Sequence, residues 1–422
     1  MEVKDEVLKN HPGWSLALEI ITVLRSHGFE AVLAGGCVRD ALLARAPKDL
    51  DIATSAEPSK VEEFFPRTVA VGKVFGVVRV LGDNSEIEVA SFRFDGKYCD
   101  GRRPQTIQFS TAAEDALRRD FTINAMFYDP VSKKVFDYVK GQEDIDLRLI
   151  RCVGRPTLRF QEDHLRLLRA VRFAAELGFE IEMDTWQALK ELAALVQSVS
   201  RERIRDEMLK ILKAENCGLG FSKLHESGLF MALDTELGKV YKKNPSLFQT
   251  SFAKATEVSN DGSIHQDNQI WARFFAAFGE RCLNRNFLEG QMKLYRLSRE
   301  AQRFIQKCLY YLNSLETIAA WNLGKKLVAF AEAEFQWAVT MVAIDPAKAS
   351  HGTWLSELKL AYQTRGLDQV FPPRLLRGED LPSSIPLTER KNVLDLAFQQ
   401  QLENSWTHRE EALAWLVKRG DG

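Results

Sequence analysis

The segment DLDI, residues 49–52, holds the residue types best suited to chemistry in this 422-residue sequence. If the segment is a strand, its side chains alternate between two faces, so Asp49 and Asp51 share one face while Leu50 and Ile52 point into a core. Two carboxylates one residue apart repel each other and can bridge one divalent cation, and oxygen ligands with room for phosphate suit Mg²⁺. A polar turn and strand end without a ligand is the alternative. The pattern favours a magnesium site at Asp49 and Asp51.

A second group of candidates lies upstream, where an apolar strand ends in Gly35 and Gly36 and a helix follows over residues 37–44. Backbone N–H groups and the helix dipole favour an anion at such a junction. Arg39, one turn into the helix, can reach the same phosphate, whereas Asp40 is expected to be structural. Neither the glycine pair nor the two aspartates are specific alone. Together they are typical of metal-dependent nucleotidyl transfer.

A third carboxylate would complete a two-metal site, in which both ions contact the attacking and leaving oxygens of an in-line displacement. The strand-like segment EIEVASF offers Glu88, with Glu86 on the same face. Glu88 lies closer to the buried part of the segment and is the preferred candidate. A solvated strand residue explains either glutamate equally well.

Paired arginines precede an apolar run in RRDFTINAMFYD, residues 118–129. One interpretation gives Arg119 the triphosphate, as a charge-assisted hydrogen-bond donor, and Asn124 a sugar or base contact. The other is a helix start with Asp120 or Thr122 as its cap. The sequence leaves both interpretations open.

An arginine stripe lies on the amphipathic helix predicted for EDHLRLLRAVRFAAELGF, residues 162–179. At about 100° per residue, Arg166, Arg169 and Arg172 fall within a sector of roughly 120°, opposite an apolar stripe. Such a stripe is usually a solvated face. Here Asp163 lies just beyond the Arg166 edge, so that an acceptor and a rigid donor stand one turn apart.

That acceptor and donor could select bases. Cytosine and adenine both present an exocyclic amine next to an unprotonated ring nitrogen, whereas uracil and guanine present a carbonyl next to a ring N–H. An acceptor and a donor in the matching order therefore accept C and A and leave unpaired groups against U and G. The pair predicts selection of two bases without a nucleic-acid template.

Elements of two kinds must position these residues. Up to about residue 150, helical and strand-like segments alternate, with a helix over 14–27, strands over 48–54, 68–82 and 85–94, and a turn over 82–85. Beyond residue 154 nearly every segment is helical, with Gly178 as the stop of the arginine helix, another helix over 200–212, and breakers over 259–262 and 372–386. The pattern predicts an α+β protein: an α/β head over 1–152, a helical neck over 153–215, and a helical body and tail over 216–422.

Composition limits the class of protein. A net charge of −1, with 27% charged and 45% hydrophobic residues, is typical of a soluble globular protein and neither implies nor excludes a nucleic-acid partner. The six cysteines are scattered without zinc spacing and predict reduced thiols. The polar N-terminus and the lack of a long apolar run predict a cytoplasmic protein with no membrane contact. No P-loop motif and no His-Asp dyad occur.

At this point the motifs resemble those of a known family. GGCVRD, KDLDIAT, RRDFTINA, FDYVKGQED, EDHLRLLR and VSRERIRDE are similar, in order and spacing, to the head and neck motifs of class II tRNA nucleotidyltransferases, the CCA-adding enzymes, and of their bacterial poly(A) polymerase relatives. The resemblance covers residues 25–215, about half of the chain. It implies a polymerase-beta-like nucleotidyltransferase head followed by all-α neck, body and tail domains.

The resemblance also implies roles for individual residues. Asp49 and Asp51 would bind the metal, and Asp163 and Arg166 would pair with the incoming base. Arg203 and Glu207 match a neck-helix motif, although an i,i+4 ion pair would explain them equally well. The positions implied to contact the nucleotide are Gly36, Arg39, Arg119, Asp163, Arg166, Arg169 and Arg172, of which Arg172 could instead be structural.

Three features distinguish the subtypes. The poly(A) polymerase relatives carry an arginine-rich run with a following histidine where this chain has VGKVFGVVRV, which looks like the tRNA enzymes. The segment RFDGKYCDGRRP, residues 93–104, looks like the loop that members adding the terminal A retain. Asp100, Arg102 and Arg103 would then take part in the switch to ATP, although a polar loop explains them as well. The missing His-Asp dyad argues against an appended phosphohydrolase domain.

We therefore expect a Mg²⁺-dependent, template-independent nucleotidyltransferase that uses ATP and CTP to build the 3′ end of tRNA, acting as a monomer. It would add C, C and A, or only the terminal A. Asp49, Asp51 and Glu88 are its expected catalytic residues. Two alternatives remain: a poly(A) polymerase that adds long A tails to RNA, and a catalytically inactive RNA-binding relative.

Overall fold

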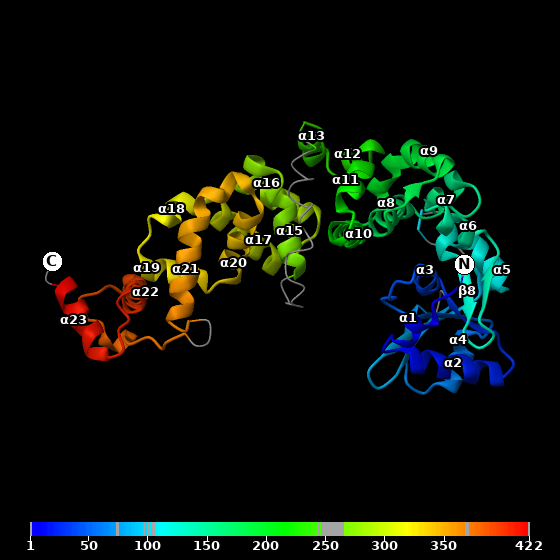
Figure 1. Cartoon of the computed structure of the whole chain (residues 1–422), viewed down its shortest axis with the longest axis horizontal. Helices are drawn as coiled ribbons and strands as arrows, with labels where there is room; N and C mark the ends of the chain where they lie inside the picture. The colour runs from blue at the N-terminus through cyan, green and yellow to red at the C-terminus, as the bar shows by residue number, and fades with distance from the viewer. Residues whose placement is uncertain are drawn as a thin grey trace. The chain divides into compact units, whose positions relative to one another are not determined.

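The computed structural model describes residues 2–72, 76–96, 98, 101–102, 104, 106–243, 245, 266–367 and 371–420. The chain separates into two compact units, Met1–Asn244 and Pro245–Gly422 (Figure 1). The boundaries predicted near residues 152 and 215 both lie inside the first unit. A mixed sheet at the N-terminus followed by helices confirms the predicted α+β architecture.

The main sheet has seven strands among the described residues, in the order β3-β4-β5-β2-β1-β8-β9. Its β2 and β5 are parallel, and its other neighbouring strands are antiparallel. The strands are β1 Ala31–Ala34, β2 Asp51–Thr54, β3 Thr68–Gly72, β4 Val77–Leu81, β5 Glu86–Ser91, β8 Met126–Asp129 and β9 Lys134–Asp137. The predicted turn is confirmed, closed by a 2.8 Å bond from Gly82 N to Ser85 O. Of the predicted strands, 48–54 contains β2, 68–82 contains two strands, β3 and β4, and 85–94 contains β5 and the first residues of a further strand.

Both faces of this sheet are covered, which explains why all four residues of β1 are buried. Helix α2, Trp14–Ser26, packs on one side through Ile20, Ile21 and Leu24. Val32, Phe92 and Phe127 form a core cluster with α5, Ala112–Arg118. Because β1 and β2 are antiparallel, the residues after β1 and those before β2 lie at the same end of these two central strands.

Helices and two small sheets make up the rest of the first unit. The small sheets pair β6 Arg93–Asp95 with β7 Ile107–Phe109, and β10 Leu149–Ile150 with β11 Glu180–Ile181. The other helices are α1 Asp5–Lys9, α3 Gly36–Leu42, α4 Pro58–Phe64, η2 Thr122–Asn124, α6 Gly141–Asp146, α7 Pro156–Glu162, α8 Arg166–Leu177, α9 Met183–Leu192, η3 Ala193–Ser198, α10 Arg201–Lys213, α11 Cys217–Glu226, α12 Leu229–Leu233 and α13 Thr235–Lys243.

The helix predicted over 162–179 is wrong at its start. The segment forms the end of α7, a turn, and α8, which begins at Arg166 and ends at the left-handed Gly178 as predicted. Asp163 is extended, with φ −138°, and its Oδ1 accepts a 3.1 Å bond from Leu165 N. This local bond satisfies the backbone in a turn instead of a helix.

The second unit is helical around an aromatic core. Its helices are α15 Gln266–Ala276, η5 Gly279–Leu283, α16 Arg285–Leu294, α17 Arg299–Asn313, α18 Leu315–Ala319, α19 Leu323–Phe330, α20 Ala333–Ile344, η6 Pro346–His351, α21 Gly352–Thr364, η7 Gly378–Asp380, α22 Leu387–Asn404 and α23 Arg409–Gly420. Trp271, Phe274 and Tyr295 pack together in its core. The breaker predicted over 259–262 lies outside the described residues, whereas 372–386 does separate α21 from α22.

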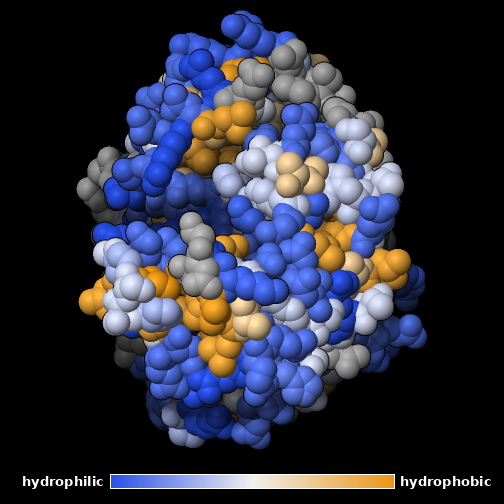
Figure 2. Space-filling model, turned by 90° about the vertical axis from the view of Figure 1, so that its left-hand side faces the viewer, coloured by the Kyte–Doolittle hydropathy of each residue, from blue (hydrophilic) through white to orange (hydrophobic). Residues whose placement is uncertain are grey.

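The close packing of α19 on α22 depends on Gly324. A Cβ added there would lie 1.8 Å from the carbonyl oxygen of Gln399, so only glycine permits this approach. Taken singly, the described helices are too short or too polar to cross a membrane, and only α19 and α20 together, bent by 95°, match by length and composition. The view in Figure 2 is mostly hydrophilic, with hydrophobic residues in separate groups. Cysteines 37, 152, 217, 282 and 308 are buried thiols that form no disulfide.

Candidate active site

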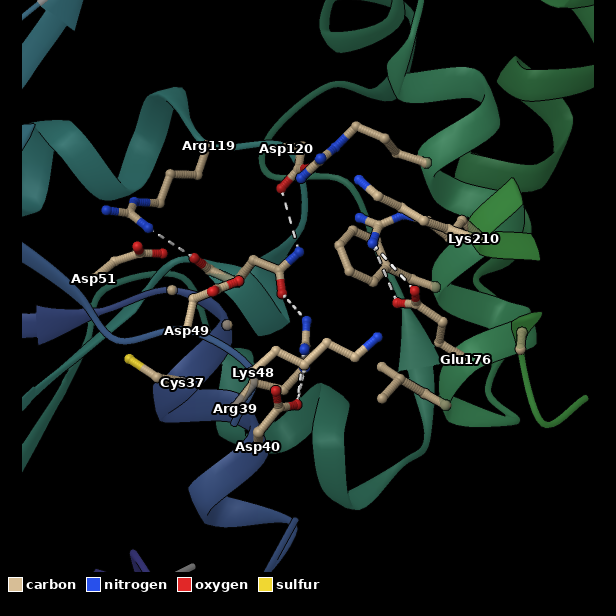
Figure 3. Close-up of a pocket in the computed structure, with 18 of the residues that line it drawn as sticks. Cys37, Arg39, Asp40, Lys48, Asp49, Asp51, Arg119, Asp120, Glu176 and Lys210 are labelled. Carbon is tan, nitrogen blue, oxygen red and sulfur yellow. Dashed lines mark hydrogen bonds and ion pairs between the residues drawn. The ribbon is translucent and has the colours of Figure 1, made fainter. Parts of the chain in front are cut away.

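One cavity in the first unit gathers nearly all of the candidates, with a volume of about 830 Å³ (Figure 3). Its lining comes from α3, the approach to β2, the segment 118–124, α8 and α10. The predicted residues in the lining are Gly36, Arg39, Asp49, Asp51, Arg119, Asp163, Arg166, Arg169 and Arg172. Segments far apart in the sequence therefore meet around one space large enough for a small ligand.

Asp49 and Asp51 line the cavity together, but only Asp51 belongs to a strand. β2 begins at Asp51, and Asp49 precedes it in an exposed loop. Leu50 and Ile52 are buried, as predicted. The alternation of side chains between two faces thus extends beyond the residues of β2 to Asp49.

The electrostatics of Asp51 show an excess of negative charge. Burial and the neighbouring Glu88 and Asp49 raise the pKa of Asp51 to about 6, while Arg119 acts to lower it. A bound cation would offset this repulsion and favour the ionised form of Asp51. Among the described residues, no group of three or more His, Cys, Asp or Glu side chains is arranged to hold a metal ion. A cation at this place would therefore take two carboxylates from the chain and its other ligands from the substrate or water.

Glu88 stands beside Asp51 in the sheet, since the two residues are paired in the parallel register of β2 and β5. Its carboxylate forms a 3.0 Å ion pair with Arg79, which also contacts Glu86 at 3.3 Å. Glu88 is half exposed and does not line the cavity. The sheet brings it close to the aspartates, but its role as a third catalytic carboxylate stays a prediction.

Arg119 is fixed beside the aspartates, as Figure 3 shows. Its Nε and Nη2 each lie 3.0 Å from Asp115 Oδ2, and its Nη1 donates a 3.1 Å bond to the carbonyl of Asn124. Gly35, at φ +76°, leaves room for it, because a Cβ there would lie 3.0 Å from Arg119 Nη1. The glycine at the end of the strand thus permits the close approach of an arginine.

Arg39 lines the cavity from α3, but its guanidinium is largely occupied. Nη1 donates a 2.6 Å bond to Asn124 Oδ1, and Nη2 forms a 2.7 Å ion pair with Asp40. Asn124 Nδ2 lies 3.4 Å from Asp120 Oδ1. Asn124 therefore joins Arg39 to Asp120 instead of presenting a free amide to a ligand. Asp40 pairs with Arg39 and also lines the cavity, so its structural role stays a prediction.

Asp163 and Arg166 face the cavity, each with partners on the chain. Both oxygens of Asp163 accept from Arg203 of α10, at 3.1 and 2.8 Å. Arg166 donates to Glu162 at 2.6 Å and to the carbonyl of Arg118 at 3.2 Å. The predicted i,i+4 explanation for Arg203 and Glu207 is wrong, because Arg203 pairs with Asp163.

The arginine stripe of α8 is not a solvated face. Arg166 and Arg172 are each 8% exposed. Arg169 pairs with Asp120 at 2.6 Å, and Arg172 pairs with Glu207 at 2.7 Å. Burial acts to raise the pKa of Asp120, but Arg169 and Arg166 outweigh it and bring that pKa down to about 2.

Sequence reasoning did not predict that carboxylates pair with the arginines of the cavity. Asp120 was considered only as a helix cap, and Asp115, Glu162 and Glu176 were not considered at all. Asp115 and Glu162 lie within one helical turn of a cavity arginine, so an arginine with an acidic residue three or four positions away was the available signal. Asp120 and Glu207 contact arginines far away in the sequence and gave no such signal.

The described part of the segment 93–104 is held next to Asp163 and Arg166. Tyr98 donates a 2.7 Å bond to Asp95, and the carbonyl of Gly101 accepts a 3.1 Å bond from His164 N. Of the predicted loop residues, Arg102 is described, while Asp100 and Arg103 lie outside the described residues. The part of the loop that is described thus contacts the residue between Asp163 and Arg166.

The sequence matches two family models and known proteins. Residues 31–151 match the family described as Poly A polymerase head domain, and residues 178–237 match that described as Probable RNA and SrmB-binding site of polymerase A. The chain is 33% identical to the CCA-adding enzyme of Bacillus pumilus over 95% of this chain and 96% of that one. It is 42% identical to the Bacillus subtilis CCA-adding enzyme over 56% of this chain and 58% of that one.

Solved structures show the same fold. The Bacillus stearothermophilus CCA-adding enzyme in complex with CTP matches with a TM-score of 0.75 and 28% identity, over 97% of this chain and 98% of that one. The Thermotoga maritima CCA-adding enzyme complexed with tRNA matches with a TM-score of 0.61 and 18% identity, over 99% of this chain and 100% of that one, which is a likeness of fold alone.

Proposed function

Because the chain belongs to the CCA-adding enzyme family and is a tRNA nucleotidyltransferase, we propose that it adds C, C and A to the 3′ end of tRNA from CTP and ATP, without a nucleic-acid template. The observation that carries this proposal is a single cavity lined both by Asp49 and Asp51 and by Asp163 and Arg166. A nucleoside triphosphate in that cavity can present its phosphates to the first pair and its base to the second.

The family uses a divalent metal, and we propose that the ion is Mg²⁺, held by Asp49 and Asp51. The donor set fits this ion, because the two carboxylates raise the local negative charge and leave positions for phosphate and water. When bound, the metal supplies Lewis acidity toward the attacking 3′-hydroxyl and the leaving pyrophosphate. Asp49 and Asp51 contribute the charge and fix its place.

Arg119 is the residue that we propose for the triphosphate. Its hydrogen bonds from Nε to Asp115 and from Nη1 to the Asn124 carbonyl, with the ion pair of Nη2 to Asp115, leave Nη1 and Nη2 each with a further N–H to donate. Two donors on a fixed plane suit the bidentate binding of a phosphate. Arg39 and Gly36 stand on the same side of the cavity and add positive charge and backbone N–H groups.

Asp163 and Arg166 are proposed to read the base. Asp163 Oδ1 accepts from both Arg203 and Leu165 N, whereas Oδ2 accepts from Arg203 and keeps a lone pair, so Oδ2 can still accept from an exocyclic amine. Arg166 uses both Nη1 hydrogens and one on Nη2, which leaves Nε–H and one Nη2–H as donors to a ring nitrogen. C and A satisfy both groups, whereas U and G leave them unpaired.

Defined tRNA transcripts test the proposal. Three transcripts, ending before CCA, after CC and after CCA, are incubated with the purified protein, a divalent metal and each NTP separately or together. We expect CCA, A and no addition, respectively, and no use of UTP or GTP. Asp49→Ala is the matched inactive control.

Each other outcome contradicts the proposal in a specific way. Addition only to the transcript ending in CC would identify a terminal A-adding enzyme. A ladder of A residues beyond the mature end would identify a poly(A) polymerase. No extension of any transcript would indicate an RNA-binding relative without catalysis.

A further inference from the structure

Asp115 of α5 is a carboxylate that does not line the cavity but contacts two arginines that do. It is 1% exposed. Its Oδ1 accepts from Arg118, with Nε at 2.9 Å and Nη2 at 2.5 Å, and its Oδ2 accepts from Arg119 Nε at 3.0 Å. Burial acts to raise the pKa of Asp115, but Arg119 and Arg118 outweigh it and keep that pKa below its ordinary value.

The first branch of this contact leads to the phosphate side of the cavity. Asp115 holds Arg119 through two nitrogens, and the ring of Phe127, 4.9 Å from the guanidinium carbon, supports the plane from one face. A guanidinium held at one edge and one face keeps its remaining donors in a fixed direction. Those donors are the two that remain for a phosphate.

The second branch leads to the base-reading side. Arg118 is held by Asp115 and also donates a 3.1 Å bond to the carbonyl of Arg93. The backbone carbonyl of Arg118 in turn accepts a 3.2 Å bond from Arg166 Nη2. Arg93 N lies 3.3 Å from Asp115 Oδ1, so the root of the loop over 93–104 is tied to the same carboxylate.

Resting on the proposed function, we propose that Asp115 is a positioning residue that sets Arg119, at the phosphates, and Arg166, at the base, in fixed relation to each other. One buried carboxylate fixes the first directly and the second through Arg118. Its loss should therefore affect both nucleotide affinity and the choice of base, which a residue that only stabilises the fold would not do.

Asp115→Asn tests this inference, because an amide keeps one acceptor oxygen and turns an NH₂ donor toward the arginines. We expect the KM for CTP and ATP to rise by about tenfold or more, since a hydrogen bond to a charged group is lost. We also expect the ratio of UTP to CTP incorporation to rise. Asp129→Asn is the matched control: Asp129 is buried and pairs with Arg25 at 2.9 Å, but does not line the cavity.

In Asp115→Asn, Arg118 and Arg119 both lose the carboxylate of Asp115. The double variant Asp115→Asn with Arg119→Gln removes one of these two arginines, and it can be tested in place of the single variant if the latter does not fold. If Asp115 acts on the phosphates through Arg119, the double variant has the nucleotide KM of Arg119→Gln alone. Its use of UTP stays raised, because the Arg118 branch remains broken, whereas Arg119→Gln alone leaves base choice unchanged.

The inference is overturned if Asp115→Asn behaves like Asp129→Asn, with lower stability but with nucleotide KM and base choice within about twofold of wild type. It is also overturned if the effects of Asp115→Asn and Arg119→Gln on KM multiply. Failure of the wild-type protein to extend tRNA would contradict the proposed function instead, so the two failures are distinguishable.

Discussion

The two units of this protein bury different kinds of side chain. In the first unit, five charged residues are each less than 10% exposed and each forms an ion pair: Asp115, Asp120, Arg166, Arg172 and Glu207. In the second unit the core is largely aromatic and aliphatic, and its buried polar residues among those described are Arg273, Gln291 and Gln401.

This difference separates a site from a scaffold. Burying charges is costly even when they are paired, so an ionic network is a poor way to gain stability. Such a network does fix the direction of guanidinium and carboxylate groups around a cavity, which catalysis and base selection require. An aromatic core stabilises a unit through area and contacts and leaves no directed polar groups.

The largest expected effect comes from a substitution in the site that lowers activity without lowering stability. Asp51→Ala should lower nucleotide incorporation by more than about a thousandfold, because a proposed metal ligand is lost. Stability at neutral pH should be unchanged or higher, since the folded state raises the pKa of Asp51 to about 6 and thus disfavours its ionised form. Single-turnover incorporation and urea denaturation measure the two quantities. Retained incorporation would remove Asp51 from the site.

The reverse experiment lowers the stability of the second unit and leaves the site unchanged. Trp271 is 2% exposed and packs on Phe274, Phe275 and Tyr295. We expect Trp271→Ala to lower the free energy of unfolding by about 3 to 5 kcal/mol. The nucleotide KM should not change, because the cavity belongs to the first unit. Leu360→Ala, at a 65% exposed position of the second unit, is the control. A raised nucleotide KM in the Trp271 variant would show that the two units are not separable in this way.

A smaller effect is expected when one ion pair of the cavity is removed. Arg203→Gln removes the ion pair that holds Asp163, and we expect kcat/KM for CTP and ATP to fall by about 10- to 100-fold. Arg205→Gln on the same helix, where Arg205 pairs with the exposed Asp206, is the matched control. Equal effects of the two substitutions on kcat/KM would show that α10 contributes only general stability.

The smallest expected effect is a pH dependence. Because the folded-state pKa of Asp51 is about 6, protonation below that pH competes with metal binding. The metal concentration for half-maximal activity should rise up to about tenfold per pH unit below 6 and stay constant above 7. Metal titrations between pH 5 and 8 measure it, and a flat profile across that range would contradict the raised pKa.

Much of the fold could be predicted, because periodicity reports which face of an element is buried. The alternating residues of 68–82 and 85–94 became β3, β4 and β5, and Trp14–Ser26 formed the expected helix. The start of α8 could not be predicted in this way. Asp163 Oδ1 accepts a bond from Leu165 N just before α8, which interrupts the helical pattern, and hydropathy does not register such a bond.

The sequence by itself determined part of the cavity lining, since strand alternation directed Asp49 and Asp51 to one face and helical spacing directed Arg166 and Arg169 to another. Only the tertiary structure decided what those residues contact. Arg169 meets Asp120 across 49 positions, and Arg203 meets Asp163 across 40. The spacing of residues within an element gives the direction of a side chain, but the group opposite it depends on how distant elements pack, and that choice fixes the ionic network of the site.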